Sequence, residues 1–356
     1  MPTAEELRIM QAYPLDLKVK KTQLRIREWV NYYGAENCAV AFSGGKDSTV
    51  LLHIVRELYP DIEAVFCNTG LEYPEIQKFA KSFDNVTVLT PKMNFREVVT
   101  KYGYPFISKE VAERVYNARE CLKSYDLRGG GTDTFNTIIS SQERFPARTS
   151  QILGTGGFFS KRYDFSRWRG LLTLDFRISH LCCNEMKKKP FHKYKKYMFV
   201  ATMTEESMLR RTAWLKTGCN AFNQGVSKPM SFWTEQDVLE YIKAHGLPIA
   251  SVYGDIVYGS RDSEQYDSTL CDCGAKLCTT GCQRTGCIFC GYGAHRDKGE
   301  SRFQRLKHTH PKRYDYCMGG GVYDTDGFWV PTTSGLGMAR CIDELNRLYG
   351  KDFIKY

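Results

Sequence analysis

The chain has 356 residues, 42% of them hydrophobic, which is enough for one large α/β domain and a smaller appendage. Its net charge of +10 at pH 7 favours anionic partners, nucleotides or nucleic acid, without choosing between them. Residues 1–27 lack the apolar core of a secretory signal, and no apolar run approaches the roughly 18 residues of a membrane helix. We therefore expect a cytoplasmic protein without a membrane partner, whose 14 cysteines serve metal or redox chemistry.

The first ninety residues alternate between helix and strand patterns. Residues 4–33 are expected to form a helical lead-in. Three strands are then predicted with helices between them, and the five elements in chain order are 38–42, 49–59, 62–67, 74–83 and 86–89. This βαβ pattern predicts a parallel, doubly wound sheet. Asn68, Thr69 and Gly70 leave the carboxyl end of the second strand, where such sheets bind ligands.

The stretch 43–48, Ser-Gly-Gly-Lys-Asp-Ser, lies between the first strand and its helix. A strand, a glycine turn and a helix N-terminus point backbone N–H groups at one spot, which suits a phosphate. The two glycines let the backbone approach the ligand, the two serines add hydroxyl groups, and Lys46 adds a mobile cation. The glycine spacing differs from that of the Walker loop. The stretch therefore predicts a phosphate site of another kind.

Two basic segments follow a further predicted helix at 108–124. Residues 126–170 combine glycines, arginines and aromatic residues and are expected to be a loop-rich insert, either a surface insert or one that tracks a nucleic-acid strand. The run 187–196 either neutralises phosphates of a polynucleotide or forms the solvated rim of a nucleotide pocket. Beyond it we expect a strand at 197–202 and a helix at 235–245, which Thr234 opens with a capping box.

The cysteines fall into groups by spacing. Cys182-Cys183 and the pair Cys287-x-x-Cys290 suit a shared metal site, because a Cys-x-x-Cys turn presents two thiolates to one ion and adjacent cysteines rarely bridge each other. Zinc or free buried thiols are the alternatives. A second group, with no standard zinc spacing, is either a second metal site or lends a ligand to the first, and consists of Cys271, Cys273, Cys278 and Cys282. We expect core thiols at Cys38, Cys67, Cys121 and Cys219.

Several of these motifs resemble one protein family. Residues 43–48 resemble the pyrophosphate loop of the ATP pyrophosphatase (PP-loop) superfamily. Residues 65–75 resemble the second motif of its phosphoadenosine phosphosulfate (PAPS) reductase branch, with Asn68 where the branch usually has an aspartate. Residues 200–210 resemble the branch's Gly-x-Arg-x-x-Glu-Ser-x-x-Arg motif, although two of its positions differ. The resemblance covers about residues 36–295.

The resemblance implies a fold and a domain division. The implied fold is α/β, with a doubly wound, mostly parallel sheet of the adenine nucleotide alpha-hydrolase-like kind and a cysteine-rich C-terminal appendage. The expected division is a helical lead-in at 1–35, a nucleotide-binding domain at 36–260 that carries the insert 126–170, and a cysteine-rich region at 261–356.

The resemblance also implies site residues. The nucleotide would contact Ser43, Gly44, Gly45, Lys46, Asp47, Ser48, Asn68, Thr69 and Gly70. Arg210 falls at a position that suits a phosphate or sulfate partner. The spacing of the first cysteine group resembles the 4Fe-4S signature of adenylyl-sulfate reductases, and Lys187 falls where those enzymes keep a lysine beside the cluster. The expected catalytic residues are Lys46, Lys187 and Arg210.

Two departures bear on the reaction. Sulfonucleotide reductases carry a catalytic cysteine in a Glu-Cys-Gly-Leu-His tail, which this chain lacks, and their loop usually departs from Ser-Gly-Gly-Lys-Asp-Ser. We therefore expect an enzyme that uses ATP, Mg²⁺ and a 4Fe-4S cluster, adenylates DNA or tRNA, releases pyrophosphate and transfers sulfur from a cysteine desulfurase. It resembles the ATP pyrophosphatase component of DNA phosphorothioation and the cluster-containing tRNA thiolases. The alternatives are a PAPS or adenylyl-sulfate reductase with a relocated nucleophile, and a non-catalytic nucleotide- and metal-binding partner.

Overall fold

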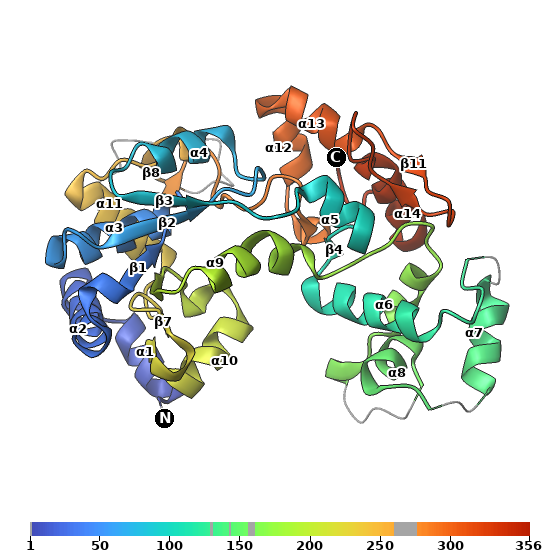
Figure 1. Ribbon diagram of the computed structural model, residues 1–356, viewed down its shortest axis with the longest axis horizontal. Coiled ribbons are helices and arrows are strands. Elements are labelled where there is room, and N and C mark those ends of the chain that lie inside the picture. The colour runs from blue at the N-terminus through green and yellow to red at the C-terminus, as the bar shows by residue number, and fades with distance from the viewer. Residues whose placement is uncertain (1, 129–130, 142–143, 156–160, 260–275) are drawn as a thin grey trace. The chain divides into compact units, whose positions relative to one another are not determined.

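The computed structural model describes residues 2–128, 131–141, 144–155, 161–259 and 276–356. The chain forms two compact units, each assembled from separate segments (Figure 1). The first unit consists of Met1–Asn68, Glu72–Thr90 and Pro190–Gly286. The second consists of Thr69–Leu71, Pro91–Lys189 and Cys287–Tyr356.

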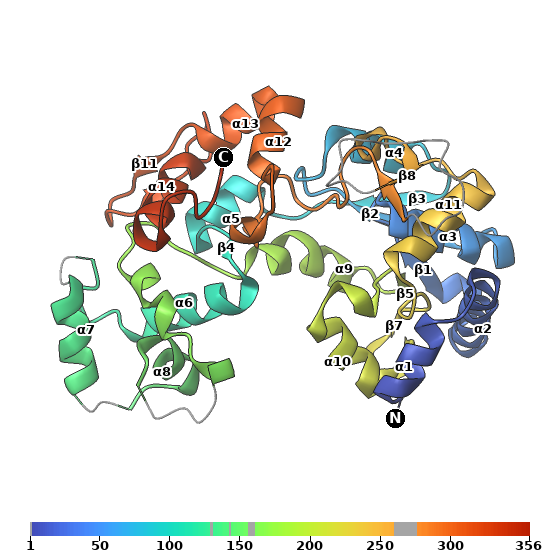
Figure 2. The ribbon, with the colours of Figure 1, turned by 180° about the vertical axis from the view of Figure 1, so that it is seen from behind.

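A six-stranded sheet organises the first unit, in the order β3-β2-β1-β5-β7-β6. Its strands in chain order are β1 (Cys38–Ala41), β2 (Glu63–Cys67), β3 (Val86–Leu89), β5 (Tyr197–Val200), β6 (Asn220–Ala221) and β7 (Val226–Ser227). Every pairing is parallel except that of β6 with β7. Figure 2, from behind, labels β1, β5 and β7 in succession. The mostly parallel α/β fold predicted from the sequence is confirmed.

Helices flank this sheet at nearly the predicted positions. They are α1 (Ala4–Gln11), α2 (Leu15–Tyr33), α3 (Lys46–Leu58), α4 (Pro74–Lys81), α10 (Met208–Thr217) and α11 (Glu235–His245). Thr234 accepts from the N–H of Asp237 and completes the predicted capping box of α11, which ends at Gly246 in the left-handed region. A short antiparallel pair, β8 (Ile256–Tyr258) and β9 (Leu277–Thr279), completes the regular structure of this unit.

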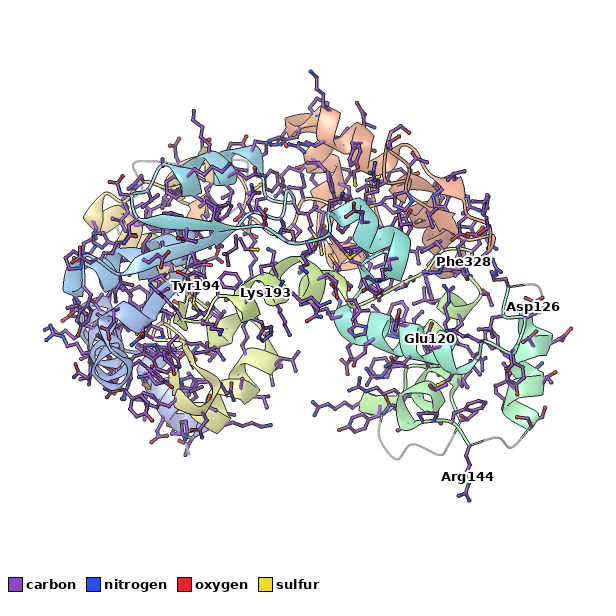
Figure 3. All side chains as sticks on the ribbon, in the orientation of Figure 1. Glu120, Asp126, Arg144, Lys193, Tyr194 and Phe328 are labelled. Carbon is purple, nitrogen blue, oxygen red and sulfur yellow. The ribbon has the colours of Figure 1, made fainter. Side chains whose placement is uncertain are left out.

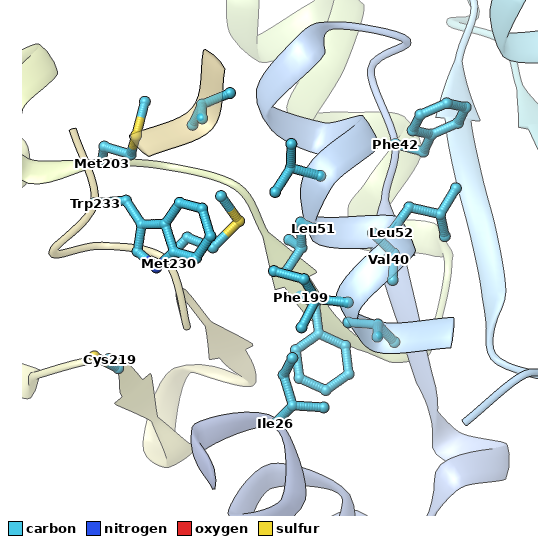
Figure 4. Close-up of a cluster of buried hydrophobic side chains, with 14 of the residues drawn as sticks. Ile26, Val40, Phe42, Leu51, Leu52, Phe199, Met203, Cys219, Met230 and Trp233 are labelled. Carbon is cyan, nitrogen blue, oxygen red and sulfur yellow. The ribbon is translucent and has the colours of Figure 1, made fainter. Parts of the chain in front are cut away.

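The core of the first unit fixes the strand that leads to the candidate loop. Figure 4 shows Val40, Leu51 and Phe199 among the side chains that pack between β1, α3 and the neighbouring strand β5. Trp29 and Trp233 are fully buried in the same cluster. Each fully buried large apolar side chain stabilises the fold by about 1.5–3 kcal/mol. The end of β1 is therefore held rigidly, and the residues that follow it project from a fixed edge.

The second unit is mainly helical. Its helices are α5 (Phe95–Tyr102), α6 (Lys109–Cys121), α7 (Gly131–Ser140), α8 (Ala147–Leu153), α12 (Arg302–Thr309), α13 (Pro311–Met318) and α14 (Met338–Tyr349). Two short strand pairs accompany them: β4 (Phe106–Ile107) with β10 (Gly291–Tyr292), and β11 (Val322–Tyr323) with β12 (Trp329–Val330). The helix α9 (Lys189–Lys193) lies where the chain returns to the first unit.

Three expectations differ from the structure. The insert 126–170 is less irregular than expected: its described residues include α7 and α8, whose apolar side chains such as Ile138 and Ile152 are buried. Cys121 is exposed at the end of α6 and is not a core thiol. The compact units also differ from the linear division at 35 and 260, because the chain adds β5 to the first sheet only after it has built much of the second unit.

Within the part of the chain that the structure covers, we find no helix whose length and hydrophobicity would let it traverse a bilayer.

Candidate nucleotide site and cysteine group

The loop between β1 and α3 passes tightly over α4. Gly44 has a φ of +70°, in the left-handed region that favours glycine. A Cβ atom on Gly44 would lie 3.0 Å from both Cγ2 and the carbonyl oxygen of Ile76, and 3.2 Å from the Cβ of Ala80. Both the dihedral angle and the available space therefore require glycine at this position of the predicted phosphate loop.

Replacing Gly44 with alanine is expected to lower the free energy of unfolding by about 2–5 kcal/mol. Left-handed backbone costs about 1–2 kcal/mol for a residue with a Cβ, and overpacking adds about 1–3 kcal/mol. Urea unfolding of Gly44→Ala measures the loss. Gly246→Ala is the matched control, because Gly246 has a φ of +58° and a Cβ atom added there would meet no described atom within 4 Å. Equal losses in the two variants would show that contact with α4 does not shape the loop.

Hydroxyl groups inside the loop hold its shape. The backbone N–H of Ser43 donates to Oγ of Ser48 over 3.1 Å, and Oγ of Ser48 donates to the carbonyl of Gly45 over 2.9 Å. The Gly45 N–H donates to Oγ of Ser43 over 3.3 Å. The two serines, which the sequence suggested as ligand donors, bond within the loop in this structure. These hydrogen bonds hold the loop in the conformation described.

The N-terminus of α3 offers hydrogen-bond donors beside this loop. The first N–H groups of a helix have no intrahelical acceptor. The Lys46 N–H donates to the hydroxyl of Tyr253 over 3.2 Å, and that hydroxyl lies 2.7 Å from Oγ1 of Thr285. Among the described residues, no acceptor is recorded for the N–H groups of Asp47 and Ser48. The Tyr253 hydroxyl thus accepts from one of the first N–H groups of α3, that of Lys46.

Removing the Tyr253 hydroxyl is expected to strengthen pyrophosphate binding by roughly twofold to tenfold, the value of one hydrogen bond of about 0.5–1.5 kcal/mol. Without a ligand, Tyr253→Phe leaves the Lys46 N–H unsatisfied, whereas a bound phosphate oxygen would satisfy it. Calorimetric titration with pyrophosphate measures the change. Tyr33→Phe is the control, because it removes a hydroxyl that donates to the carbonyl of Phe222 elsewhere in this unit. Weaker binding in Tyr253→Phe would instead mean that the hydroxyl donates to the ligand.

Lys46 is a buried cation held by two carboxylates. Its side chain is 4% exposed, and its Nζ lies 3.1 Å from Oδ1 of Asp47 and 3.3 Å from Oε1 of Glu235. Burial alone would lower the pKa of Lys46, but the two carboxylates raise it above its ordinary value. Burial also raises the pKa of Asp47, and Glu206 and Glu235 add to that increase against the opposing effect of Lys46. The ammonium group is therefore charged at neutral pH, and an incoming phosphate competes with carboxylates for it.

The remaining predicted nucleotide residues lie at strand and helix ends. Asn68 directly follows β2, and its N–H donates to the carbonyl of Leu89 over 2.8 Å. Thr69 is buried, and Gly70 has a φ of +74°. Arg210 lies in the first turn of α10 and forms an ion pair with Glu206. Glu206 is also one of the acids that act on Asp47. Arg210 is therefore linked to the acids around Lys46 through Glu206.

All four cysteines of the first group lie in the second unit. Cys182 and Cys183 begin a helical turn that continues as a π-helix at Asn184–Lys188, a rare form that often marks functional sites. The N–H of Cys290 donates to the carbonyl of Cys287 over 3.0 Å and closes a tight turn. The two cysteine pairs of the sequence therefore lie in two separate local structures, a helical turn and a tight turn, each with two thiols.

Electrostatics shows that the four thiols lie close together. Burial and the neighbouring Cys183, Cys287 and Cys290 raise the pKa of Cys182, while Lys187 lowers it. Burial and Cys287 also raise the pKa of Cys290 to about 11. The structure thus brings the four cysteines and Lys187 into one neighbourhood. In the conformation described, no three His, Cys, Asp or Glu side chains of the covered residues are arranged to hold a metal ion.

The other predicted thiols have separate positions. Cys271 and Cys273 lie outside the described residues. Cys278 lies in β9 and Cys282 is buried, both in the first unit, so a second metal site stays a prediction. The core positions predicted for the remaining thiols are confirmed for Cys38, Cys67 and Cys219.

The family model of the phosphoadenosine phosphosulfate reductase domain matches residues 37–127. This segment of the chain is therefore similar to the PAPS reductase domain. The matched residues include β1, the glycine loop, α3 and the neighbouring strands β2 and β3.

Individual relatives match shorter or more distant stretches. An uncharacterized protein of Methanocaldococcus jannaschii is 29% identical over 201 residues, which cover 52% of this chain and 47% of that protein. A phosphoadenosine 5'-phosphosulfate reductase of Xanthomonas euvesicatoria is 32% identical over 73 residues, 20% of this chain and 30% of the relative. The chain thus spans about half or less of the length of these curated relatives.

Among solved structures, the chain is similar to a PAPS reductase from Candida auris in a phosphate complex. The identity is 12% and the TM-score 0.32, with 74% of this chain and 98% of that chain covered.

Proposed function

We propose that this protein is an ATP-dependent sulfur-transfer enzyme that cleaves ATP between its α- and β-phosphates and passes sulfur to an adenylated nucleic acid. The observation that carries the proposal is the loop 43–48, shaped in advance at a helix N-terminus and accompanied by the buried ammonium of Lys46. These groups form a site for a pyrophosphate, which a sulfonucleotide without β- and γ-phosphates does not need.

The loop would act by electrostatic stabilisation of the leaving pyrophosphate. The N–H groups of Asp47 and Ser48 and the positive end of α3 are fixed dipoles that need no reorganisation as charge develops. Lys46 adds a full charge, which its raised pKa maintains at neutral pH. The adenylated acceptor then carries a good leaving group, so that a sulfur nucleophile can displace AMP from it.

The carboxylates beside Lys46 suit a Mg²⁺ ion that arrives with the nucleotide. Mg²⁺ is usually held by one or two carboxylates together with substrate phosphates. Asp47 and Glu235, both within 3.3 Å of the Lys46 ammonium, are the residues that would hold it. Such a shared ion would also offset the negative charge that the two carboxylates bring to the phosphate site.

We propose that Cys182, Cys183, Cys287 and Cys290 hold a 4Fe-4S cluster, for which their thiols would have to move from the conformation described. Four thiols are the donors that iron–sulfur clusters prefer, and zinc is the alternative metal for the same set. When bound, the cluster would hold or relay the sulfur that is to be transferred. Burial and the neighbouring thiols raise the pKa of Cys182, and the positive charge of Lys187 acts against that increase.

The net charge of +10 and the basic run 187–196 support a polyanionic acceptor, which DNA or tRNA would satisfy. Sulfur would come from a cysteine desulfurase. Since each neutralised phosphate releases counterions, turnover on nucleic acid should fall steeply as salt rises.

A second candidate is reduction of PAPS or adenylyl-sulfate, which the family domain and the Xanthomonas relative favour. This reaction needs an accessible thiolate nucleophile. The late cysteines Cys317 and Cys341 are both fully buried, and burial raises the pKa of each. Buried thiols with raised pKa values are inert, so neither residue suits the role of a relocated nucleophile.

The deciding experiment follows the products of α-labelled ATP with DNA or tRNA and a cysteine desulfurase. Pyrophosphate and AMP, with sulfur in the nucleic acid, would support the proposal. ADP and orthophosphate would contradict it. Sulfite released from PAPS without ATP would identify the reductase, and the absence of turnover on every substrate would favour the non-catalytic partner.

A further inference from the structure

The second unit contains a cavity of about 680 Å³ that the proposed reaction does not use. It lies beside the C-terminal half of α6, the turn that follows α6 and the loop between β11 and β12. Figure 3 labels Glu120, Asp126 and Phe328, which line it. The cavity is large enough for a nucleotide and lies within the range of small-molecule sites in proteins.

Three arginines surround the ring of Phe328 in this cavity. Their guanidinium carbons lie 5.8 Å, 4.3 Å and 4.0 Å from the ring centroid for Arg119, Arg128 and Arg177, respectively. They come from α6, from the turn after it and from the segment that follows the insert. Positive charges from three separate parts of the chain therefore converge on one aromatic side chain.

Among the described residues, only one of the three arginines has carboxylate partners. Arg177 donates to Asp324 over 2.8 Å and to Asp326 over 3.2 Å. Arg119 instead donates to the carbonyl oxygens of Phe176, Leu171 and Leu174, over 2.6 to 3.0 Å. Arg128 donates to the carbonyl of Gly327 over 2.8 Å. Carbonyl oxygens fix a guanidinium group but do not neutralise it.

Arg119 and Arg128 therefore differ from the other charged residues that line the cavity, most of which form ion pairs. Of the acids that line it, Glu120 pairs with Lys123 at 2.7 Å and Asp326 pairs with Arg177. Asp126 accepts from the backbone N–H of Arg128, over 3.2 Å. No ion pair is recorded for Arg119 or Arg128 within the described ranges. Burial, together with Arg128 and Arg177, lowers the pKa of Arg119 to about 9, which an anion in the cavity would reverse.

The rest of the lining is aromatic. Tyr102, Tyr116 and Tyr125 line the cavity beside the arginines. Tyrosine rings offer both an apolar face for a planar base and a hydroxyl for its edge. A phosphate monoester carries the charge of about −2 that two guanidinium groups without carboxylate partners match, and arginine binds phosphate with paired hydrogen bonds.

We propose that this cavity is a second ligand site, which binds a nucleoside monophosphate with its phosphate at Arg119 and Arg128 and its base among the tyrosines. The ligand is either a free mononucleotide or the terminal unit of a nucleic-acid strand, because both present the same phosphate and base. The site is separate from the loop 43–48 and takes a ligand without a pyrophosphate group.

Binding is tested by calorimetric titration with uridine 5'-monophosphate, inorganic phosphate and a 5'-phosphorylated single-stranded oligonucleotide. Arg128→Gln, at an exposed residue whose replacement should not disturb folding, is expected to weaken uridine monophosphate binding by roughly tenfold to a hundredfold. Arg119→Gln should weaken it further, after a thermal melt has shown that it folds. Arg347→Gln is the control, since Arg347 is exposed in α14 of the same unit, does not line the cavity and, unlike Arg128, pairs with a carboxylate.

Equal affinity in wild type and Arg128→Gln would overturn the proposal, as would the absence of binding of all three probes. Inorganic phosphate that binds as tightly as uridine monophosphate would overturn the assignment of the tyrosines to a base. Tighter binding of the oligonucleotide than of the mononucleotide identifies a strand end as the ligand, and the reverse order identifies a free nucleotide. Lys46→Met separates the two sites: uridine monophosphate binding should persist in it, and its loss would place the ligand at the loop instead.

Discussion

Replacing Lys46 with methionine is expected to lower the rate of pyrophosphate release from ATP by roughly a hundredfold to a thousandfold, as the loss of one preorganised charge-stabilising group does in other enzymes. Methionine keeps most of the volume of lysine, so the change removes a charge from a buried position without opening a large cavity. Steady-state assays of pyrophosphate and AMP measure the effect.

The expected result has a specific electrostatic origin. In the wild-type protein Asp47 and Glu235 share the Lys46 ammonium, and the variant leaves these carboxylates without it. Anionic phosphates would then meet uncompensated negative charge. Because the pKa of Lys46 is raised, its charge is present at neutral pH and lost only in strongly alkaline solution, so wild-type ATP affinity should not decline through this residue up to about pH 9.

Lys20→Met is the charge-matched control. Lys20 lies in α2 of the same unit, its side chain is 74% exposed, and its contact with Asp16 is 3.9 Å long. This variant should keep full activity, because an exposed ion pair contributes little. Unchanged pyrophosphate release in Lys46→Met would show that Lys46 takes no part in the reaction. Release of orthophosphate instead of pyrophosphate by the wild type would contradict the proposed reaction.

Cys183→Ser and Cys290→Ser are each expected to lose most of the iron from anaerobically purified protein, whereas the wild type should carry about four irons per chain. Each variant removes one thiolate from a different local structure, the helical turn at 182–183 or the turn at 287–290. Iron and sulfide quantitation and the visible absorption of the cluster measure the loss.

Cys121→Ser is the matched control, because Cys121 belongs to the same unit, is exposed and lies outside the group. It should keep the iron content of the wild type. Full iron content in both Cys183→Ser and Cys290→Ser would show that the ligand set is wrong. Zinc without iron in the wild type would show that the four cysteines form a structural zinc site and not an iron–sulfur cluster.

The sequence predicted those features that local patterns determine. The strand, glycine turn and helix around Gly44 follow from an apolar run, two glycines and a helical spacing, all within a few residues. Thr234 and Asp237 form their capping box because its geometry depends only on a three-residue spacing. The proximity of the four cysteines followed from family resemblance, since no local rule connects residues 183 and 287.

Features that depend on distant contacts were not predictable. Tyr253 and Thr285 reach the N-terminus of α3 from segments more than two hundred residues further along the chain, and neither carries a motif. The contacts of Arg119 and Arg128 with the ring of Phe328 likewise join segments that are far apart in the chain. In the insert 126–170, glycine content suggested irregular chain, but the burial of apolar side chains such as Ile138 and Ile152 decided the outcome in favour of helices.

The order of strands in the sheet has a consequence for synthesis on the ribosome. β1 pairs on one side with β2, which follows closely, and on the other side with β5, which begins only at Tyr197. At about 5–20 residues per second, roughly seven to twenty-seven seconds pass between the emergence of the two partners. During that interval one edge of β1 is unpaired and exposed to other nascent chains. Protection of this edge by chaperones would therefore matter most while residues 91–189 are being made.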